Sequence, residues 1–173
     1  NTTLIAGGKL TPYRRVAQRV VDLLSPKVPC LTRDVPLDER AGPPPAVFSD
    51  SYAAHLYWSY GSEADWIERR QLQHTEETRE LCPGILPHRL AEVSLAVIGE
   101  QACTLCDVLV RRVPLALLAP DNGRMVAPDV ADHMAKLLNR DQSWAREQVA
   151  SYMLVVDRMH QWKRDPPNDP IAP

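Results

Sequence analysis

The sequence has almost no phenylalanine, no long apolar run and no excess of charge. With one Phe and four Trp, any core must be built mainly from aliphatic side chains. The apolar run Val113–Ala119 is far shorter than the roughly 20 residues that a membrane-spanning helix needs. The net charge of −2 comes from 20 basic and 22 acidic residues, so no basic surface for nucleic acid is expected.

Two chemical signatures are also missing. The seven glycines form no G-x-G-x-x-G, so the sequence holds no dinucleotide-binding fingerprint. No His-x-x-x-His pair occurs either, and the histidines are scattered along the chain, which leads us to assign no metal site to them. They are His55, His74, His88, His133 and His160.

The four cysteines do not have the spacing of a small disulfide-rich domain. They are Cys30, Cys82, Cys103 and Cys106, and we interpret them as reduced thiols in a cytosolic compartment. Cys103 and Cys106 have the spacing of half a zinc site, but no second pair accompanies them. Packing of small side chains at a helix junction is therefore the favoured interpretation.

The prolines divide the chain. They gather at 26–45 and 166–173, and an extended path through Pro43–Pro45 suits a linker. We therefore predict a strand, turn and helix over 1–25, a linker over 26–47, a helical domain over 48–164 and a disordered tail over 165–173. The first residue is Asn1 rather than Met, which indicates a fragment of a longer chain.

The fold class predicted for residues 48–164 is mainly α, a helical bundle. Capping residues and apolar periodicity predict several helices. These are 51–60 ended by Gly61, a helix capped by Ser62, 88–101, 105–112 capped by Thr104, 127–138, and 142 to about 162 capped by Asp141. A loop containing Pro83-Gly84 is predicted over 81–87.

The N-terminal segment predicts a strand at 2–6, a turn at Gly7-Gly8 and a helix that begins at Thr11-Pro12 and stops near Ser25. Glycines let a ligand approach the backbone, and a helix N-terminus favours anions. Lys9 would add a positive charge to such a site. A plain turn before a helix has the same pattern, and on spacing alone the plain turn is favoured over an anion site.

The pair Arg111-Arg112 allows two interpretations as well. The two arginines could bind phosphate, or they could pair with nearby carboxylates. Asp107 and Arg111 have the i, i+4 spacing of a helical ion pair, and Glu100 is also near in sequence. A structural network of ion pairs is favoured.

Two segments together resemble a known family. Residues 5–14 resemble the G-G-K-[LW]-T-T-Y-R signature of the FAD-dependent glycerol-3-phosphate dehydrogenases, with Pro12 in place of a Thr. Tyr60-Gly61-Ser62 resembles the Y-G-S turn of that family, and Ala91-Glu92-Val93 begins a stretch similar to A-E-V…E-x-A-x-T-L-x-D-x-L-x-R-R. That stretch continues here through Glu100, Ala102, Thr104, Leu105, Asp107, Leu109, Arg111 and Arg112.

The resemblance implies a function for the parent enzyme. Such an enzyme oxidises sn-glycerol 3-phosphate to dihydroxyacetone phosphate, and its electrons pass from FAD to quinone, or to oxygen in related oxidases. By position, Gly7, Gly8 and Leu10 would border the flavin, and Lys9 would lie between flavin and substrate as the candidate catalytic residue. The segment 1–25 would then be the end of the FAD-binding domain.

The resemblance also implies expectations for the fragment. It is expected to be inactive and to bind no FAD alone, because the adenine and pyrophosphate sites lie elsewhere. The parent enzyme is expected in the cytoplasm, at the inner face of the cell membrane. The catalytic domain of the same chain is the expected partner of the helical domain, and a homodimer is one expected assembly. The alternative is a self-standing helical protein-interaction module, because the helical part shows no catalytic constellation in sequence.

Overall fold

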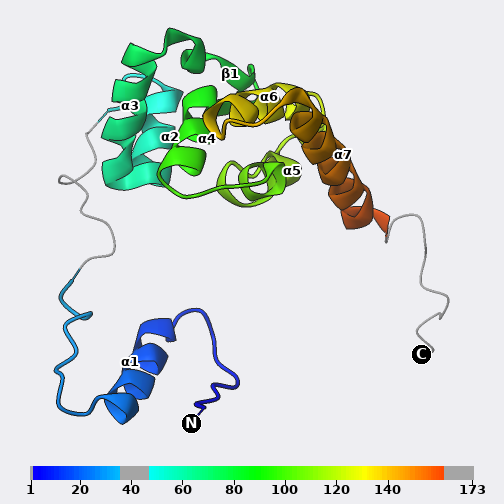
Figure 1. Ribbon diagram of the computed structural model, residues 1–173. Helices are drawn as coiled ribbons and strands as arrows, with labels where there is room; N and C mark the ends of the chain where they lie inside the picture. Colours follow the sequence, from blue (N-terminus) through cyan, green and yellow to red (C-terminus); the bar gives the residue numbers. More distant parts are fainter. Residues whose placement is uncertain (1, 36–46, 162–173) are drawn as a thin grey trace, which may run out of the picture. The chain divides into compact units, whose positions relative to one another are not determined.

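The computed structural model describes residues 2–35 and 47–161. The chain divides into two units, of which the first ends at Ala41 and the second begins at Gly42. Figure 1 shows helix α1 (Tyr13–Leu24) in the first unit and a helical body in the second. Of the predicted linker at 26–47, the structure describes only 26–35 and Val47. The predicted tail at 165–173 lies outside the described residues.

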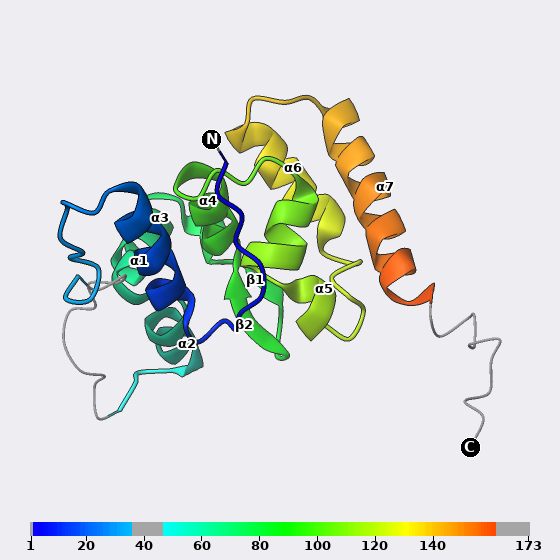
Figure 2. The same ribbon diagram turned by 90° about the horizontal axis from the view of Figure 1, so that it is seen from below.

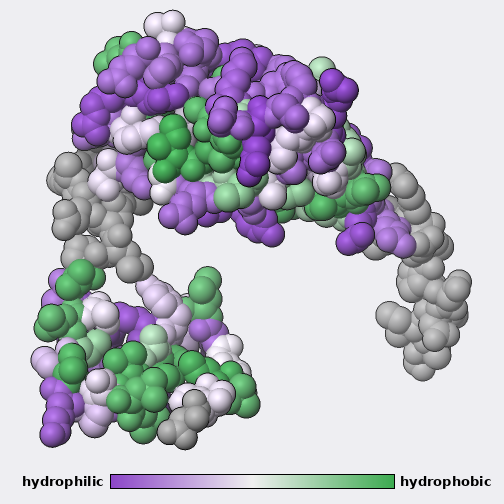
Figure 3. Space-filling view, viewed as in Figure 1, coloured by the Kyte–Doolittle hydropathy of each residue, from purple (hydrophilic) through white to green (hydrophobic). Residues whose placement is uncertain are grey.

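The first unit contains helix α1 (Tyr13–Leu24), none of whose residues is buried. The helix ends before Ser25, as predicted, because Pro26 follows. It begins one residue later than predicted, with Pro12 as the N-cap and no side-chain cap from Thr11. Apolar side chains such as Leu10, Leu23 and Leu24 are exposed on this unit, and Figure 3 shows apolar surface gathered there.

The predicted strand at 2–6 is wrong. Residues 2–9 have no regular secondary structure, and the two strands that the structure describes pair only with each other. A β-branched, apolar sequence favours extended backbone, but a strand also needs a neighbour that takes its N–H and C=O groups. No such neighbour occurs among the described residues.

The second unit is mainly α, as predicted. Its helices are α2 (Ser51–Tyr60), α3 (Ala64–Gln73), α4 (Leu90–Ile98), α5 (Leu115–Leu118), α6 (Ala127–Leu137) and α7 (Gln142–Met159). The unit also contains two 3₁₀ turns, η1 (Gly61–Glu63) and η2 (Thr75–Thr78), and a π-helical segment, η3 (Asp107–Arg112). Its two strands, β1 (Glu80–Cys82) and β2 (Leu86–Arg89), form a hairpin. No helix of the described ranges is long and apolar enough to cross a membrane.

Helix α4 lies at the centre of this unit, and every residue from Leu90 to Val97 is buried. Ala91 and Leu95, one turn apart, pack with Leu56 of α2 and Ile67 of α3 in one apolar cluster. Other residues of α4, including Val93, belong to a larger cluster with α6 and α7. Figure 2 shows α6 and α7 beside each other, with α4 nearer to α6. Helix α4 is mainly apolar, with Glu92 and Ser94 as its polar residues, and its neighbours cover it on all sides.

The segment 81–87, predicted as a loop, is instead the core of a hairpin. Glu80 pairs with Arg89 and Cys82 with Leu86 in antiparallel register, and Gly84 takes a φ of +69° at the turn. The strands are too short to show an alternating pattern in sequence. The hairpin also shortens the predicted helix 88–101, since α4 starts only at Leu90.

The predicted caps had mixed outcomes. Asp141 accepts a hydrogen bond from the backbone N–H of Trp144, so the cap of α7 is confirmed, although the helix ends at Met159 rather than near Trp162. Thr104 Oγ1 accepts from the backbone N–H of Asp107, and the Asp107 carboxylate accepts from that of Thr104, which confirms the cap at Thr104. Ser62 is not the N-cap residue of the next helix, because it lies inside η1 and Glu63 has that position before α3.

Candidate functional site

The glycine turn of the first unit is open. Gly7 and Gly8 have φ values of +81° and +127°, and a Cβ added to either would meet no atom within 4 Å. Such φ values favour glycine, so the sequence does specify this turn. Lys9 and Leu10 are both exposed. The predicted cofactor-binding residues thus lie together in one accessible segment before α1.

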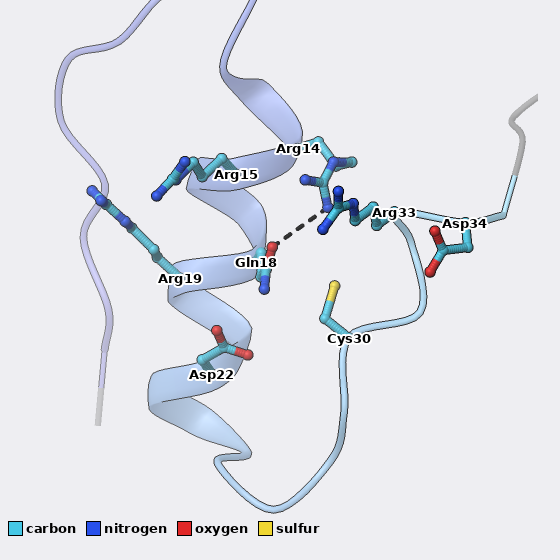
Figure 4. A pocket seen from close by; sticks show the side chains of 8 residues that line it. All are labelled: Arg14, Arg15, Gln18, Arg19, Asp22, Cys30, Arg33 and Asp34. Atoms are coloured by element: carbon cyan, nitrogen blue, oxygen red, sulfur yellow. Dashed lines mark hydrogen bonds between the residues drawn. The ribbon is translucent and has the colours of Figure 1, made fainter.

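A hollow beside α1 is rich in arginine. Figure 4 shows Arg14 and Arg33 on the side of the helix that faces the following loop, with Cys30 near them. Arg14 Nη1 donates a weak hydrogen bond of 3.4 Å to Gln18 Oε1. The glycine turn does not line this hollow, whose lining residues are Arg14, Arg15, Gln18, Arg19, Asp22, Cys30, Arg33 and Asp34. The arginines and the turn are therefore separate features of this unit.

A buried carboxylate lies at the centre of the second unit. Glu92 is 1% exposed, and its Oε2 atom lies 2.9 Å from His55 Nε2 and 2.7 Å from His88 Nδ1. Tyr60 donates its hydroxyl to the same oxygen at 2.7 Å. The other oxygen, Oε1, accepts from the backbone N–H of Arg89 at 2.6 Å, which caps α4. We call the set of Glu92, His55, His88 and Tyr60 the Glu92 centre.

The Glu92 centre keeps its carboxylate ionised. Burial by itself raises the pKa of Glu92, but the hydrogen bonds from His55 and His88 and their electrostatic interaction with the carboxylate outweigh it and lower the pKa to about 2. For Tyr60, burial and the neighbouring Glu92 charge both raise the pKa, so the phenol stays protonated as a donor. The arrangement is a charged acceptor surrounded by donors.

The Glu92 centre opens to a hollow of about 360 Å³. Three members of the Glu92 centre, His55, Tyr60 and His88, line it. The other lining residues are Ser59, Glu63, Glu100, Arg111, Arg112, Pro114 and Leu118. Several residues through which the sequence resembles the dehydrogenase family therefore meet here, although they lie far apart in the chain.

The arginine pair forms ion pairs, as favoured from the sequence. Arg111 Nη1 lies 2.7 Å from Asp107 Oδ1, and Arg112 Nε lies 2.9 Å from Glu100 Oε2. Arg112 also donates to the backbone carbonyl of Glu100. With both guanidinium groups engaged, the hollow offers no strongly positive wall for a phosphate.

The cysteines do not act as a unit. Cys106 packs against the larger apolar cluster, and burial raises the pKa of its thiol, so the packing interpretation is right for this residue. It is wrong for Cys103, which is exposed and lies before the helix. The helical turn that begins at Leu105 separates the two environments. All four cysteines are free thiols.

A second buried carboxylate, Glu77, has different partners. Arg70 contacts it with two nitrogens, Nε at 3.0 Å from Oε2 and Nη2 at 2.7 Å from Oε1. His133 Nε2 lies 3.6 Å from Oε1 and 2.8 Å from Ser94 Oγ. This group joins η2, α3 and α6 to α4.

Comparison with known proteins identifies the class to which this mainly α domain belongs. Residues 2–145 match the family described as the C-terminal domain of alpha-glycerophosphate oxidase. The chain belongs to this family, and the resemblance seen in the sequence is confirmed.

The curated relatives are glycerol-3-phosphate dehydrogenases. A probable mitochondrial one from Dictyostelium discoideum is 31% identical over 161 residues, which cover 84% of this chain and 25% of the relative. One from Synechocystis is 28% identical over 167 residues (88% of this chain, 30% of the relative). An aerobic one from Bacillus subtilis is 26% identical over 164 residues (80% and 29%). The chain thus spans under a third of the length of these relatives. No solved structure matches it significantly.

Sequence reasoning missed the Glu92 centre. His55 and His88 were interpreted as scattered histidines, yet the structure brings both onto one carboxylate. His55 lies 37 residues from Glu92, so no local spacing could reveal the contact. The one local signal is the four-residue separation of His88 and Glu92, but His88 lies in β2, before α4 begins, so helical periodicity does not predict this contact.

Proposed function

We propose that this chain is the C-terminal, mainly helical part of an FAD-dependent enzyme that oxidises sn-glycerol 3-phosphate to dihydroxyacetone phosphate. The observation that carries the proposal is the family match over 2–145, which includes both the glycine turn and most of the helical unit. The relatives named glycerol-3-phosphate dehydrogenase support the substrate. Quinone is the proposed electron acceptor, with the parent enzyme on the inner face of the cell membrane.

The glycine turn is the part of this chain proposed to meet FAD. Positive φ values and open space at Gly7 and Gly8 fit the close approach of a flat ring to the backbone. Gly7, Gly8 and Leu10 would border the flavin. When bound, FAD supplies the acceptor for the hydride that leaves the substrate. One turn cannot hold so large a ligand, so the chain alone should purify colourless and inactive.

Lys9 is the proposed catalytic residue of this segment. Its ammonium group would stabilise an anion, which is either the substrate phosphate or the negative charge that the reduced flavin carries. A phosphate contact made equally in ground and transition states affects KM, whereas a contact made only in the transition state affects kcat. The two roles can therefore be separated by kinetics.

The test is Lys9→Ala in the full-length parent enzyme loaded with flavin. We expect kcat/KM to fall by about 30- to 1,000-fold, which corresponds to the roughly 2–4 kcal/mol of one preorganised electrostatic contact. A rise in KM alone would assign Lys9 to the phosphate, and a fall in kcat would assign it to the flavin side.

The matched control is Lys27→Ala, an exposed lysine of the same unit. It should leave kcat/KM unchanged. If Lys9→Ala retains near-full activity in a folded, flavin-loaded enzyme, the proposed role of the turn is wrong.

A further inference from the structure

The Glu92 centre contains a donor set that its hydrogen bonds do not fully explain. His55 of α2, His88 of β2 and Glu92 of α4 each offer one possible ligand atom, and these atoms all lie within 4.8 Å of one another. Two imidazole nitrogens and one carboxylate oxygen are a donor set common in zinc sites. The three residues come from three different elements, so tertiary packing alone assembles the set.

The charge of Glu92 has no permanent counter-ion. Among the described residues, no Lys or Arg side chain lies within ion-pair distance of this carboxylate. Glu77, which is equally buried, has the Arg70 guanidinium beside it. A buried charge is costly unless it is paired or coordinates a metal. A cation at the Glu92 centre would supply what Arg70 supplies at Glu77.

Coordination would replace two hydrogen bonds, because His55 Nε2 and His88 Nδ1 donate to Glu92 Oε2 in this structure and must carry no proton when they bind a metal ion. A histidine ligand needs one unprotonated ring nitrogen, and its other nitrogen is usually fixed by an outer partner. His55 has such a partner, because Ser59 Oγ lies 3.2 Å from its Nδ1. The donor atoms now lie 2.7 and 2.9 Å from Glu92 Oε2. Around a tetrahedral ion with ligands at about 2.0–2.2 Å, they would separate to about 3.3 Å.

The hollow of about 360 Å³ completes the site. It gives an ion a path to His55 and His88, and it leaves room for water as the fourth ligand. We propose that His55 Nε2, His88 Nδ1 and Glu92 form a binding site for a divalent transition-metal ion, with Zn²⁺ as the ion that the donor set favours. Imidazole ligands disfavour Mg²⁺ and Ca²⁺, which prefer oxygen donors.

A second group of possible ligands, His74, Glu76 and Glu77, does not qualify in the same way. The Glu77 carboxylate already accepts hydrogen bonds from Nε and Nη2 of Arg70, and Glu76 is exposed. These residues instead provide the matched control for the experiment.

The experiment titrates ZnCl₂ into the 173-residue chain, prepared without a histidine tag and stripped with EDTA. We expect one equivalent of zinc to remain after gel filtration. Histidine-ring ¹⁵N spectra of the wild-type chain should show coordination through Nε2 of one ring, His55, and through Nδ1 of another, His88. This Nε2 and Nδ1 pair is a signature that loose surface binding would not reproduce.

The variants assign the site. His55→Gln should lower zinc affinity by more than about 100-fold, since loss of an outer partner alone typically costs about 10- to 100-fold. His74→Gln should leave the affinity unchanged. Absence of retained zinc, coordination by other rings, or a folded His55→Gln chain with unchanged affinity would each overturn the proposal. If His55→Gln does not fold, the wild-type ring spectrum decides between the outcomes.

Discussion

The two buried glutamates of the helical unit, Glu77 and Glu92, show two ways of placing a carboxylate inside a protein. Both are 1% exposed. Glu77 is paired with the planar guanidinium of Arg70, which stays charged at every pH of interest. Glu92 accepts hydrogen bonds from two imidazoles and a phenol, none of which carries a permanent charge. The first arrangement is a fixed ion pair, and the second leaves a negative centre that can take a cation.

The pKa values of the two buried carboxyl groups are shifted in the same direction. Burial by itself raises the pKa of each carboxyl, and the partners outweigh it so that both pKa values are lowered. At Glu77 the main opposing groups are Arg70 and Ser94, and at Glu92 they are His55 and His88. Removal of a partner should therefore destabilise each site, but by different amounts.

The largest effect is expected for Arg70→Met. The change leaves Glu77 buried without its counter-ion, which typically costs about 3–5 kcal/mol of unfolding free energy. Urea unfolding followed by circular dichroism measures it. The control is Arg69→Met, an exposed neighbour on the same helix, which should change the stability little. Equal losses of unfolding free energy in the two variants would show that the buried ion pair stabilises the fold no more than an exposed arginine does.

The next effect is the response of Glu92 to acid. Its pKa is 4.5 in ordinary surroundings and about 2 in the folded chain, a difference worth roughly 3 kcal/mol. Because the folded pKa is the lower one, this stability is fully present above pH 4.5 and is lost as the pH falls toward 2. Unfolding free energies measured from pH 6 to pH 2.5 should show it.

The matching variant is Glu92→Gln, which has no carboxyl to titrate at this position. The acid-induced loss of stability should be smaller in this variant than in the wild-type chain. An identical pH dependence would mean that Glu92 does not contribute to it, and that Glu77 and the exposed carboxylates account for acid unfolding.

The smallest of the three effects is expected for Tyr60→Phe. The variant removes one of the donors to Glu92 Oε2 and leaves the two histidines. We expect a loss of about 1.5–3 kcal/mol, which is typical of a hydrogen bond to a charged group. Thermal unfolding checks it, with Tyr13→Phe as a control in the first unit. If Tyr60→Phe lost as much unfolding free energy as Arg70→Met, the proposed difference between the Glu92 and Glu77 sites would be wrong.

Local signals predicted much of the helical framework. Asp141 and Thr104 were identified as caps from their positions before apolar periodic segments, and the structure confirms both. Gly61 ends α2 with a φ of +53°, a conformation that glycine adopts without strain. These features depend on residues within one or two turns of each other, which is why a sequence reveals them.

Pairing between segments was not predictable in this way. The strand expected at 2–6 lacks a partner among the described residues, while β1 and β2 formed where Pro83 and Gly84 suggested only a loop. Extended backbone becomes a strand only when a neighbour satisfies its polar groups. Strands as short as these show no alternating pattern in sequence, so whether such a segment forms a strand depends on the segment that pairs with it.

The sequence by itself determined the helix boundaries near strong caps, the positive-φ turn at Gly7-Gly8 and the family to which the chain belongs. Each of these is encoded in residues that are close together or in a collinear pattern. Only the tertiary structure placed His55 and His88 on Glu92 and gave Arg70 to Glu77. Such contacts depend on how separate helices pack around α4, because burial in the core forces each carboxylate to find partners from whichever elements lie against it.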